Sequence, residues 1–382
     1  ARIPVSTGRT AVQVTDFDDR DKQVNHTNPD EQIQAYPELW EDTPYIEPSL
    51  AQWRRLYQAT SRIKKQKPWL YLADNDLVTI ELPQREEPSF VSIMGKNQKN
   101  YGICIYPGFK SFLGCLKMRQ AEDGEPSFIT HSYQNCFTCV FGNNKDLMPE
   151  DKDVLRQLGI SFRGDNQWIY FRSNRSGFLP WRLNASQVDL VADIVESLYG
   201  VSEDLRQKQI KVDFLAEQVL NRYFEPKDGS WHSRVTQVPP IPMDSLRLTI
   251  NDQLFIARLK KAKINGTSLE LDLVYLPLPY LISPDSVPAY PQICLLADAP
   301  NQEIVDQYML NSEDRGEVVI LGMLADYITN NGKPWRISVR DQQMALLLED
   351  FCQKLSIQLI FGKGLPMIDY FAKGLAEFGK RF

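Results

Sequence analysis

Two aspartates in the last third of the chain each follow a predicted β-strand. Asp298 follows Ile293–Ala297, and Asp341 follows Ile337–Arg340. In an α/β sheet with parallel strands, the carboxyl ends share one edge, where ligands usually bind. Two carboxylates at such an edge could bind Mg²⁺ and support in-line phosphoryl transfer. The spacing therefore makes Asp298 and Asp341 candidate catalytic residues.

The elements around these acids resemble the ribonuclease H and integrase arrangement over about residues 290–380. The order is a strand with Asp298, a hairpin strand, a helix, a strand with Asp341 and a helix. That family takes a third acid from a later helix, so the resemblance implies Asp369 or Glu377 in this role. Neither residue stands in a clear motif, which indicates a degenerate form of the fold. No cofactor is expected, and Mg²⁺ enters only if the unit is an enzyme.

Both strand-end aspartates also have an ordinary structural interpretation. Asp298 lies just ahead of Pro300 and has the position of a turn residue. Asp341 immediately precedes a helix predicted to begin at Gln342 and has the position of its N-cap. The residue types favour this interpretation over catalysis.

Residues 162–181 are dense in aromatic side chains and arginines. Such side chains form binding hot spots and can stack on nucleic-acid bases. The candidates for contact with a partner are Arg163, Trp168, Arg172 and Trp181. The alternative is a core strand whose aromatic side chains pack inward while its arginines extend to solvent.

The cysteines and histidines carry weaker signals. Cys136 and Cys139 have the spacing of a redox or zinc pair, but no second pair follows. On a strand, positions i and i+3 face opposite sides, so all six cysteines are predicted to be buried free thiols of a reducing compartment. The three histidines suggest no Ser–His or Cys–His nucleophile, and the chain has no glycine-rich phosphate loop.

The composition narrows the class of protein further. The chain has 382 residues, 43% of them hydrophobic, which is enough for two or three domains with sizeable cores. The net charge of −6 gives no global attraction to nucleic acid or to an anionic membrane. The charge therefore indicates no particular partner, and a nucleic-acid or a protein partner both stay open. No apolar run approaches the ~20 residues needed to cross a bilayer, and the first residues lack the pattern of a signal peptide. We therefore expect a soluble cytoplasmic protein.

Periodicity and turn residues divide the chain into four parts. Residues 1–47 are predicted to form a polar arm, 48–200 an α+β domain, 201–244 a helical connector with a proline-rich linker, and 245–382 an α/β domain. The connector is predicted to be helical over 203–226 because its apolar residues recur at helical spacing. Strand and helix alternate in the last domain, which implies parallel strands in a mixed sheet. The predicted fold class is α+β with two domains.

The individual elements follow from hydrophobic spacing and from turn residues. The predicted strands are 76–82, 89–94, 101–106, 136–142, 167–173, 269–276, 292–297, 303–310, 336–339 and 357–361. The predicted helices are one between Pro48 and Pro68, then 108–118, 150–158, 187–199, 252–261, 318–330, 342–355 and one after Pro366. Gly159 and Gly200 are predicted to end their helices.

The chain resembles a group of uncharacterised bacterial two-module proteins over roughly residues 48–382. The first module carries the motifs Pro68-Trp69-Leu70, Ser92-Ile-Met-Gly95, Tyr101-Gly102-Ile103 and Pro180-Trp181, and the second carries Pro291–Asp298 and Pro334–Asp341. The group has no assigned activity, so the resemblance supports the two-module architecture and implies no catalytic residues. The sequence therefore predicts a non-enzymatic binding or regulatory protein of unknown function. The alternative is a Mg²⁺-dependent nuclease or phosphoryl-transfer enzyme that uses Asp298 and Asp341.

Overall fold

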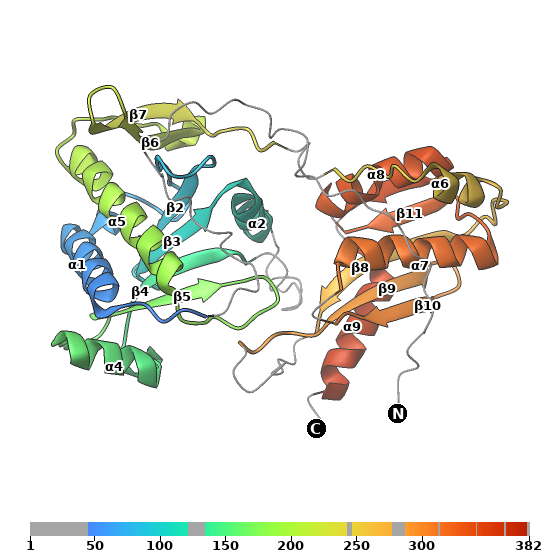
Figure 1. The fold of residues 1–382 in the computed structure, drawn as a ribbon, viewed down its shortest axis with the longest axis horizontal. Coiled ribbons are helices and arrows are strands. Elements are labelled where there is room, and N and C mark those ends of the chain that lie inside the picture. The colour runs from blue at the N-terminus through green and yellow to red at the C-terminus, as the bar shows by residue number, and fades with distance from the viewer. Residues whose placement is uncertain are drawn as a thin grey trace, which may run out of the picture. The chain divides into compact units, whose positions relative to one another are not determined.

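The computed structural model describes residues 45–120, 134–242, 247–276, 287–311, 314–340, 342–362 and 364–379. The predicted arm therefore lies almost entirely outside the described residues. The chain divides into two compact units, an N-terminal unit that ends at Ile241 and a C-terminal unit that begins at Pro242. Each unit combines helices with one mixed β-sheet (Figure 1), so the prediction of a two-domain α+β fold is confirmed.

The N-terminal unit is built on a seven-stranded sheet with the order β5-β4-β3-β2-β1-β6-β7. Its strands are β1 (Leu77–Glu81), β2 (Ser89–Met94), β3 (Gly102–Pro107), β4 (Cys136–Gly142), β5 (Trp168–Asn174), β6 (Gln218–Glu225) and β7 (Ser230–Gln237). Neighbouring strands are antiparallel, except that β1 and β6 are parallel.

Two long helices cover one face of this sheet. Helix α1 (Leu50–Gln66) begins with a capping box, in which the side chain of Ser49 and that of Gln52 satisfy each other's backbone amides. Helix α5 (Ala185–Arg206) begins in the same way at Asn184. The two helices lie side by side (Figure 1) and share the larger core of the unit with every second residue of the strands below them.

Two shorter helices also belong to the described part of the N-terminal unit. Helix α4 (Pro149–Leu158) packs beside α1. Helix α2 (Phe109–Gln120) packs on β3 and adds Phe112 to a second, smaller core cluster on the opposite face of the sheet. The side chains of β1 alternate between the two clusters, with Val78 in the larger and Leu77 in the smaller.

Two predictions at the end of this unit are wrong. The predicted helix over 203–226 is absent, because α5 ends at Arg206 and β6 then joins the sheet beside β1. Gly200 lies inside α5 and does not end it. The guanidinium of Arg222 occupies the space that a side chain at position 200 would need. A Cβ atom on Gly200 would lie 2.5 Å from Nη2 of Arg222.

All six cysteines are free and buried, as predicted. Cys139 belongs to the core cluster under α1 and α5, whereas Cys136 belongs to the cluster under α2. The two thiols therefore face opposite sides of β4 and form no pair. Burial raises the pKa of the Cys139 thiol above its usual range, which keeps it protonated.

The C-terminal unit is built on a five-stranded sheet with the order β10-β9-β8-β11-β12. Its strands are β8 (Ser268–Tyr275), β9 (Gln292–Asp298), β10 (Glu303–Met309), β11 (Arg336–Val339) and β12 (Gln358–Phe361). The central strand β8 is antiparallel to β9 and parallel to β11, and β12 is parallel to β11.

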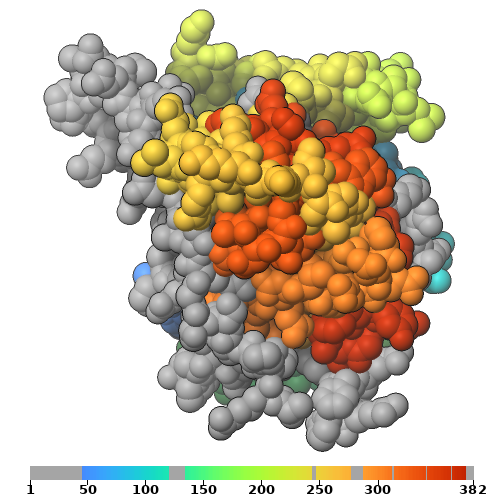
Figure 2. Space-filling model, turned by 90° about the vertical axis from the view of Figure 1, so that its right-hand side faces the viewer, coloured from blue at the N-terminus to red at the C-terminus, as the bar shows by residue number. Residues whose placement is uncertain are grey.

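Helices lie on both faces of the smaller sheet. Its helices are α6 (Gln253–Lys260), α7 (Gly316–Asn331), α8 (Gln342–Leu355) and α9 (Pro366–Gly379). The first three share a core with Leu269 and Leu271 of β8, whereas α9 packs against β8 and β9 on the other face. On one side of the unit, the yellow segment near residue 250 lies next to the orange and red elements from later in the chain (Figure 2). Among the described residues, no helix has both the length and the apolar character to cross a membrane.

Candidate functional site

Asp298 ends β9 and is 4% exposed. Its carboxylate accepts hydrogen bonds from the backbone amide of Asn301 at 3.2 Å and from the side-chain amide of Asn301 at 2.9 Å. These contacts close the turn between β9 and β10, which is the structural role that the sequence favoured.

The expectation that the ends of β9 and β11 share one edge of the sheet is wrong. Asp298 pairs with Leu269 near the start of β8, whereas Val339 of β11 pairs with Leu271. Because β9 is antiparallel to β8 and β11 is parallel to it, the carboxyl ends of β9 and β11 lie at opposite edges. Asp341 itself lies outside the described residues.

The central strand β8 is parallel to β11 and shares its carboxyl edge, and it carries two acids. Glu270 and Asp272 alternate with Leu269 and Leu271, so both acids point to the face that α9 covers. Their exposed fractions are 5% and 6%. Buried carboxylates require charge partners or hydrogen-bond donors, and both are present.

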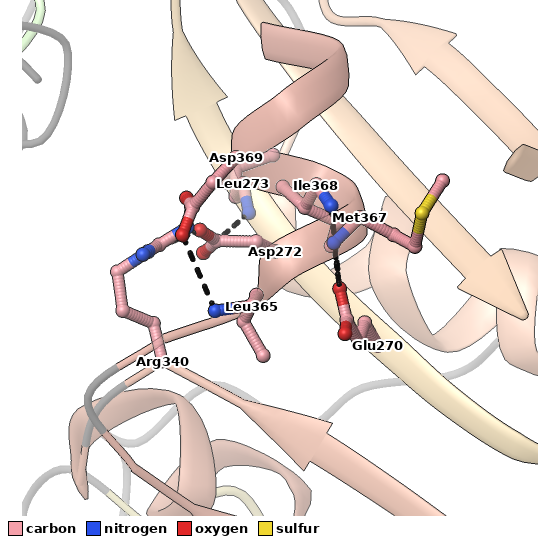
Figure 3. A network of polar contacts seen from close by, with 8 residues as sticks. All are labelled: Glu270, Asp272, Leu273, Arg340, Leu365, Met367, Ile368 and Asp369. Carbon is pink, nitrogen blue, oxygen red and sulfur yellow. Dashed lines mark hydrogen bonds and ion pairs between the residues drawn. The ribbon is translucent and has the colours of Figure 1, made fainter. Parts of the chain in front are cut away.

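Arg340 links β8 to α9 through the buried carboxylate of Asp272 and the partly exposed carboxylate of Asp369 (Figure 3). Its Nε donates to Oδ2 of Asp272 at 2.6 Å, and its Nη2 donates to Oδ1 of Asp369 at 2.7 Å. Asp369 also accepts the backbone amide of Leu365 at 3.3 Å, just ahead of α9. Burial by itself would lower the pKa of Arg340, but the charges of Asp272 and Asp369 outweigh it and raise that pKa.

Glu270 binds the first turn of α9 from below (Figure 3). Its Oε2 accepts the backbone amides of Met367 at 3.0 Å and Ile368 at 3.2 Å. Helix N-termini leave such amides unpaired, and the helix dipole favours a negative charge there. Burial nevertheless raises the pKa of Glu270, only partly offset by these two hydrogen bonds. The four side chains, Glu270, Asp272, Arg340 and Asp369, are called the Arg340 network below.

In the Arg340 network the carboxylates are already neutralised or hydrogen-bonded by protein groups, so the network does not resemble an open cation site. One guanidinium lies between two carboxylates, and the third carboxylate is held by backbone amides. Among the described residues, no group of three or more His, Cys, Asp or Glu side chains has the geometry to hold a metal ion. Of the two candidates for a third acid, Asp369 is joined to β8 through Arg340. The side chain of Glu377 is not among those that the structure describes.

Replacement of Glu270 by glutamine tests the raised pKa. The folded state binds the Glu270 proton more tightly than the unfolded chain does, so protonation adds stability as the pH falls toward the ordinary value of 4.5. This contribution is lost as the pH rises through the raised folded-state pKa. Because Glu270→Gln does not titrate, the difference in opening free energy, wild type minus variant, should increase on acidification. Amide hydrogen exchange in β8 and α9, corrected for intrinsic rates, measures it, and a difference independent of pH would contradict the assignment.

The four predicted contact residues of the aromatic segment do not form one patch. Trp168 begins β5 and Trp181 pairs with Ser173 near its end, so the two indoles lie at opposite ends of the strand. Arg163 is exposed in the preceding loop. Arg172 is buried, and it donates to both carboxylate oxygens of Asp151 in α4, at 3.1 and 2.7 Å.

Glu270, Asp272 and Arg340 were not among the candidate site residues predicted from the sequence. A signal for the first two was present, because acids alternate with leucines in Leu269-Glu270-Leu271-Asp272. In a strand buried on both faces this alternation indicates carboxylates that need partners inside the protein.

Comparison with known families divides the chain in the same way as the structure. Residues 53–222 match a domain of unknown function (DUF7309), and residues 255–376 match a second domain of unknown function (DUF6930). No curated protein matches the chain. The first match lies within the N-terminal unit and the second within the C-terminal unit. The chain is thus a two-module protein, and each module contains a match to a domain of unknown function.

Proposed function

We propose that this is a non-enzymatic binding or regulatory protein of the bacterial cytoplasm, whose C-terminal unit is a degenerate ribonuclease H-like fold. The observation that carries the proposal is the position of Arg340 between Asp272 and Asp369. The guanidinium supplies the positive charge that a divalent cation would otherwise bring to these carboxylates.

The sheet of the C-terminal unit supports the ribonuclease H-like part of the proposal. A central strand is followed by two antiparallel strands and then by two parallel strands, each preceded by a helix. In this arrangement the first strand is β8, so the acids at the shared edge come from Glu270 and Asp272 and not from Asp298. Six buried free thiols support a reducing compartment.

A nuclease assay tests the absence of catalysis. Wild-type protein and the Asp272→Asn variant are incubated with millimolar Mg²⁺ or Mn²⁺ and with labelled single-stranded DNA, duplex DNA, RNA and an RNA–DNA hybrid. We expect no cleavage by the wild type above that of the variant. Metal-dependent cleavage that disappears in Asp272→Asn would overturn the proposal.

The Mg²⁺-dependent nuclease or phosphoryl-transfer enzyme remains the competing hypothesis. As predicted from the sequence, this enzyme would use Asp298, but the carboxylate of Asp298 accepts two hydrogen bonds from Asn301 in a turn. An Asp298→Asn variant belongs in the same assay, because cleavage lost in that variant alone would restore the original pair of acids.

A further inference from the structure

Lys64 holds its ammonium in a half-buried position near the C-terminal end of α1. Its Nζ donates to the backbone carbonyl and to Oε1 of Gln167, both at 2.8 Å. An ammonium has three N–H donors, so Gln167 leaves one of them for another acceptor.

Among the residues that the structure describes, no carboxylate forms an ion pair with Lys64, and burial lowers the pKa of Lys64 to about 8. A partly desolvated charge without a counter-charge is costly. An anion that approached the remaining donor would relieve this cost, so the position suits a phosphate.

Aromatic rings surround the ammonium in a connected row. Nζ of Lys64 lies 5.5 Å from the ring centroid of Phe141 and 6.0 Å from that of Phe162. The row continues through three ring pairs: Phe162 and Trp168 at 6.0 Å, Phe141 and Trp69 at 5.7 Å, and Trp69 and Tyr101 at 5.1 Å. Phe141 is buried, whereas the other four rings are only half-buried. Phe141 lies near the end of β4 and Trp168 at the start of β5, two neighbouring strands at one side of the sheet (Figure 1), while Tyr101 directly precedes β3.

The four segments that carry the row are strongly basic. They are 64–70, 95–101, 141–146 and 162–168, and we call them together the Lys64 surface. They contain seven cationic side chains and two carboxylates, Asp146 and Asp165, although the whole chain has a net charge of −6. Lys96 also reaches the row directly, because its Nζ donates to the carbonyl of Leu70 beside Trp69.

We propose that the Lys64 surface binds single-stranded nucleic acid. The ammonium of Lys64 contacts a backbone phosphate, and the half-buried rings of Trp69 and Phe162 provide faces on which bases stack. The proposal rests on the proposed binding function, but it does not depend on the Arg340 network.

Single strands fit this surface better than the other anionic polymers. A duplex hides the faces of its bases, so it could use the cations but not the rings. An acidic protein segment would likewise be attracted by the charge, but it has no flat π-systems to match a row of aromatic rings. Arg163 and Trp168, two residues that the sequence predicted as contacts, belong to the surface, whereas Arg172 and Trp181 do not.

Fluorescence anisotropy with short labelled oligo-dT and oligo-A RNA tests the proposal on the full chain. We expect binding that weakens with salt. Lys64→Gln should reduce the slope of log affinity against log salt by about 1, as the loss of one phosphate contact predicts. Trp69→Leu should weaken binding about tenfold, which is the typical loss of one stacked base. Lys99→Gln, at an exposed position, should also weaken binding and avoids any loss of packing.

Matched controls lie at the other end of the same sheet. Lys227→Gln and Trp231→Leu, beside and on β7, should leave the affinity unchanged. Three results would overturn the proposal: no binding at low salt, equal losses in the controls, or equal displacement of the oligonucleotide by poly-glutamate, which would indicate an acidic protein partner. A failure of binding together with a negative nuclease assay would leave the proposed non-enzymatic function standing.

Discussion

Replacement of Arg340 by methionine is expected to lower the free energy of opening of the C-terminal unit by about 3–5 kcal/mol, the range for removal of one partner from a buried ion pair. The variant leaves Asp272 and Asp369 without their shared cation, and Asp272 is almost fully buried. The effect should be local, because Arg340 joins β8 to α9. Amide hydrogen exchange of peptides from β8 and α9 measures it without requiring the whole chain to unfold as one unit.

An exposed ion pair in the same unit provides the control. Arg247 pairs with Glu349, and both side chains are nearly half exposed. Arg247→Met should therefore cost only about 0–1 kcal/mol. If Arg340→Met costs no more than this control, the Arg340 network does not hold α9 in place.

A second replacement separates two costs of Arg340→Met, the loss of the ion pairs and the burial of a carboxylate without a partner. In the Arg340→Met background, Asp272→Asn removes one of the two carboxylates left without a partner. The double variant should be more stable than Arg340→Met alone, because most of the cost of breaking a buried pair comes from the remaining charge. Additive losses from the two replacements would contradict this explanation.

Elements fixed by local patterns were predicted at their observed bounds. The strands Ser89–Met94, Cys136–Gly142 and Arg336–Val339 and the helix Gln342–Leu355 are examples. Each contains the period-2 or period-3.6 pattern in its own residues, and turn or cap residues mark its ends. Such information is short-range, so one sequence suffices.

Elements fixed by distant partners were not predictable in the same way. The segment 218–225 has apolar spacing compatible with a helix, but it forms β6 because Val78 of β1 offers a parallel neighbour opposite Leu220. Its other neighbour, β7, was not recognised as a strand at all, since most of its residues are polar and partly exposed. Local periodicity does not encode either pairing.

The same distinction explains the candidate site. The sequence indicates that Asp298 ends a strand, and the structure agrees. It does not indicate in which direction that strand runs relative to β11, because the direction depends on the pairing with β8. Once β8 is known to be central, the acids Glu270 and Asp272 become the relevant carboxylates, and Arg340 their partner.

Replacement of Arg172 by methionine is expected to destabilise the N-terminal unit by about 3–5 kcal/mol. Its guanidinium makes a bidentate contact with Asp151, and both side chains are 8% exposed. Asp151 in turn accepts the backbone amide of Met148 and so fixes the start of α4. Hydrogen exchange should therefore increase in α4 and in β5, the two elements that the ion pair joins.

Two further variants separate this interior role from a role in partner binding. Arg156→Met removes an exposed i,i+3 pair with Asp153 in the same helix, and it should cost about 0–0.5 kcal/mol. Arg172→Lys keeps the charge but not the planar two-pronged contact, so its loss of stability should fall between those of Arg156→Met and Arg172→Met. A stable Arg172→Met protein with weakened oligonucleotide binding would instead make Arg172 a contact residue, as the aromatic segment first suggested. The burial of its guanidinium against Asp151 predicts the opposite: stability should change, and at conditions where the variant is folded the Lys64 surface should bind as in the wild type.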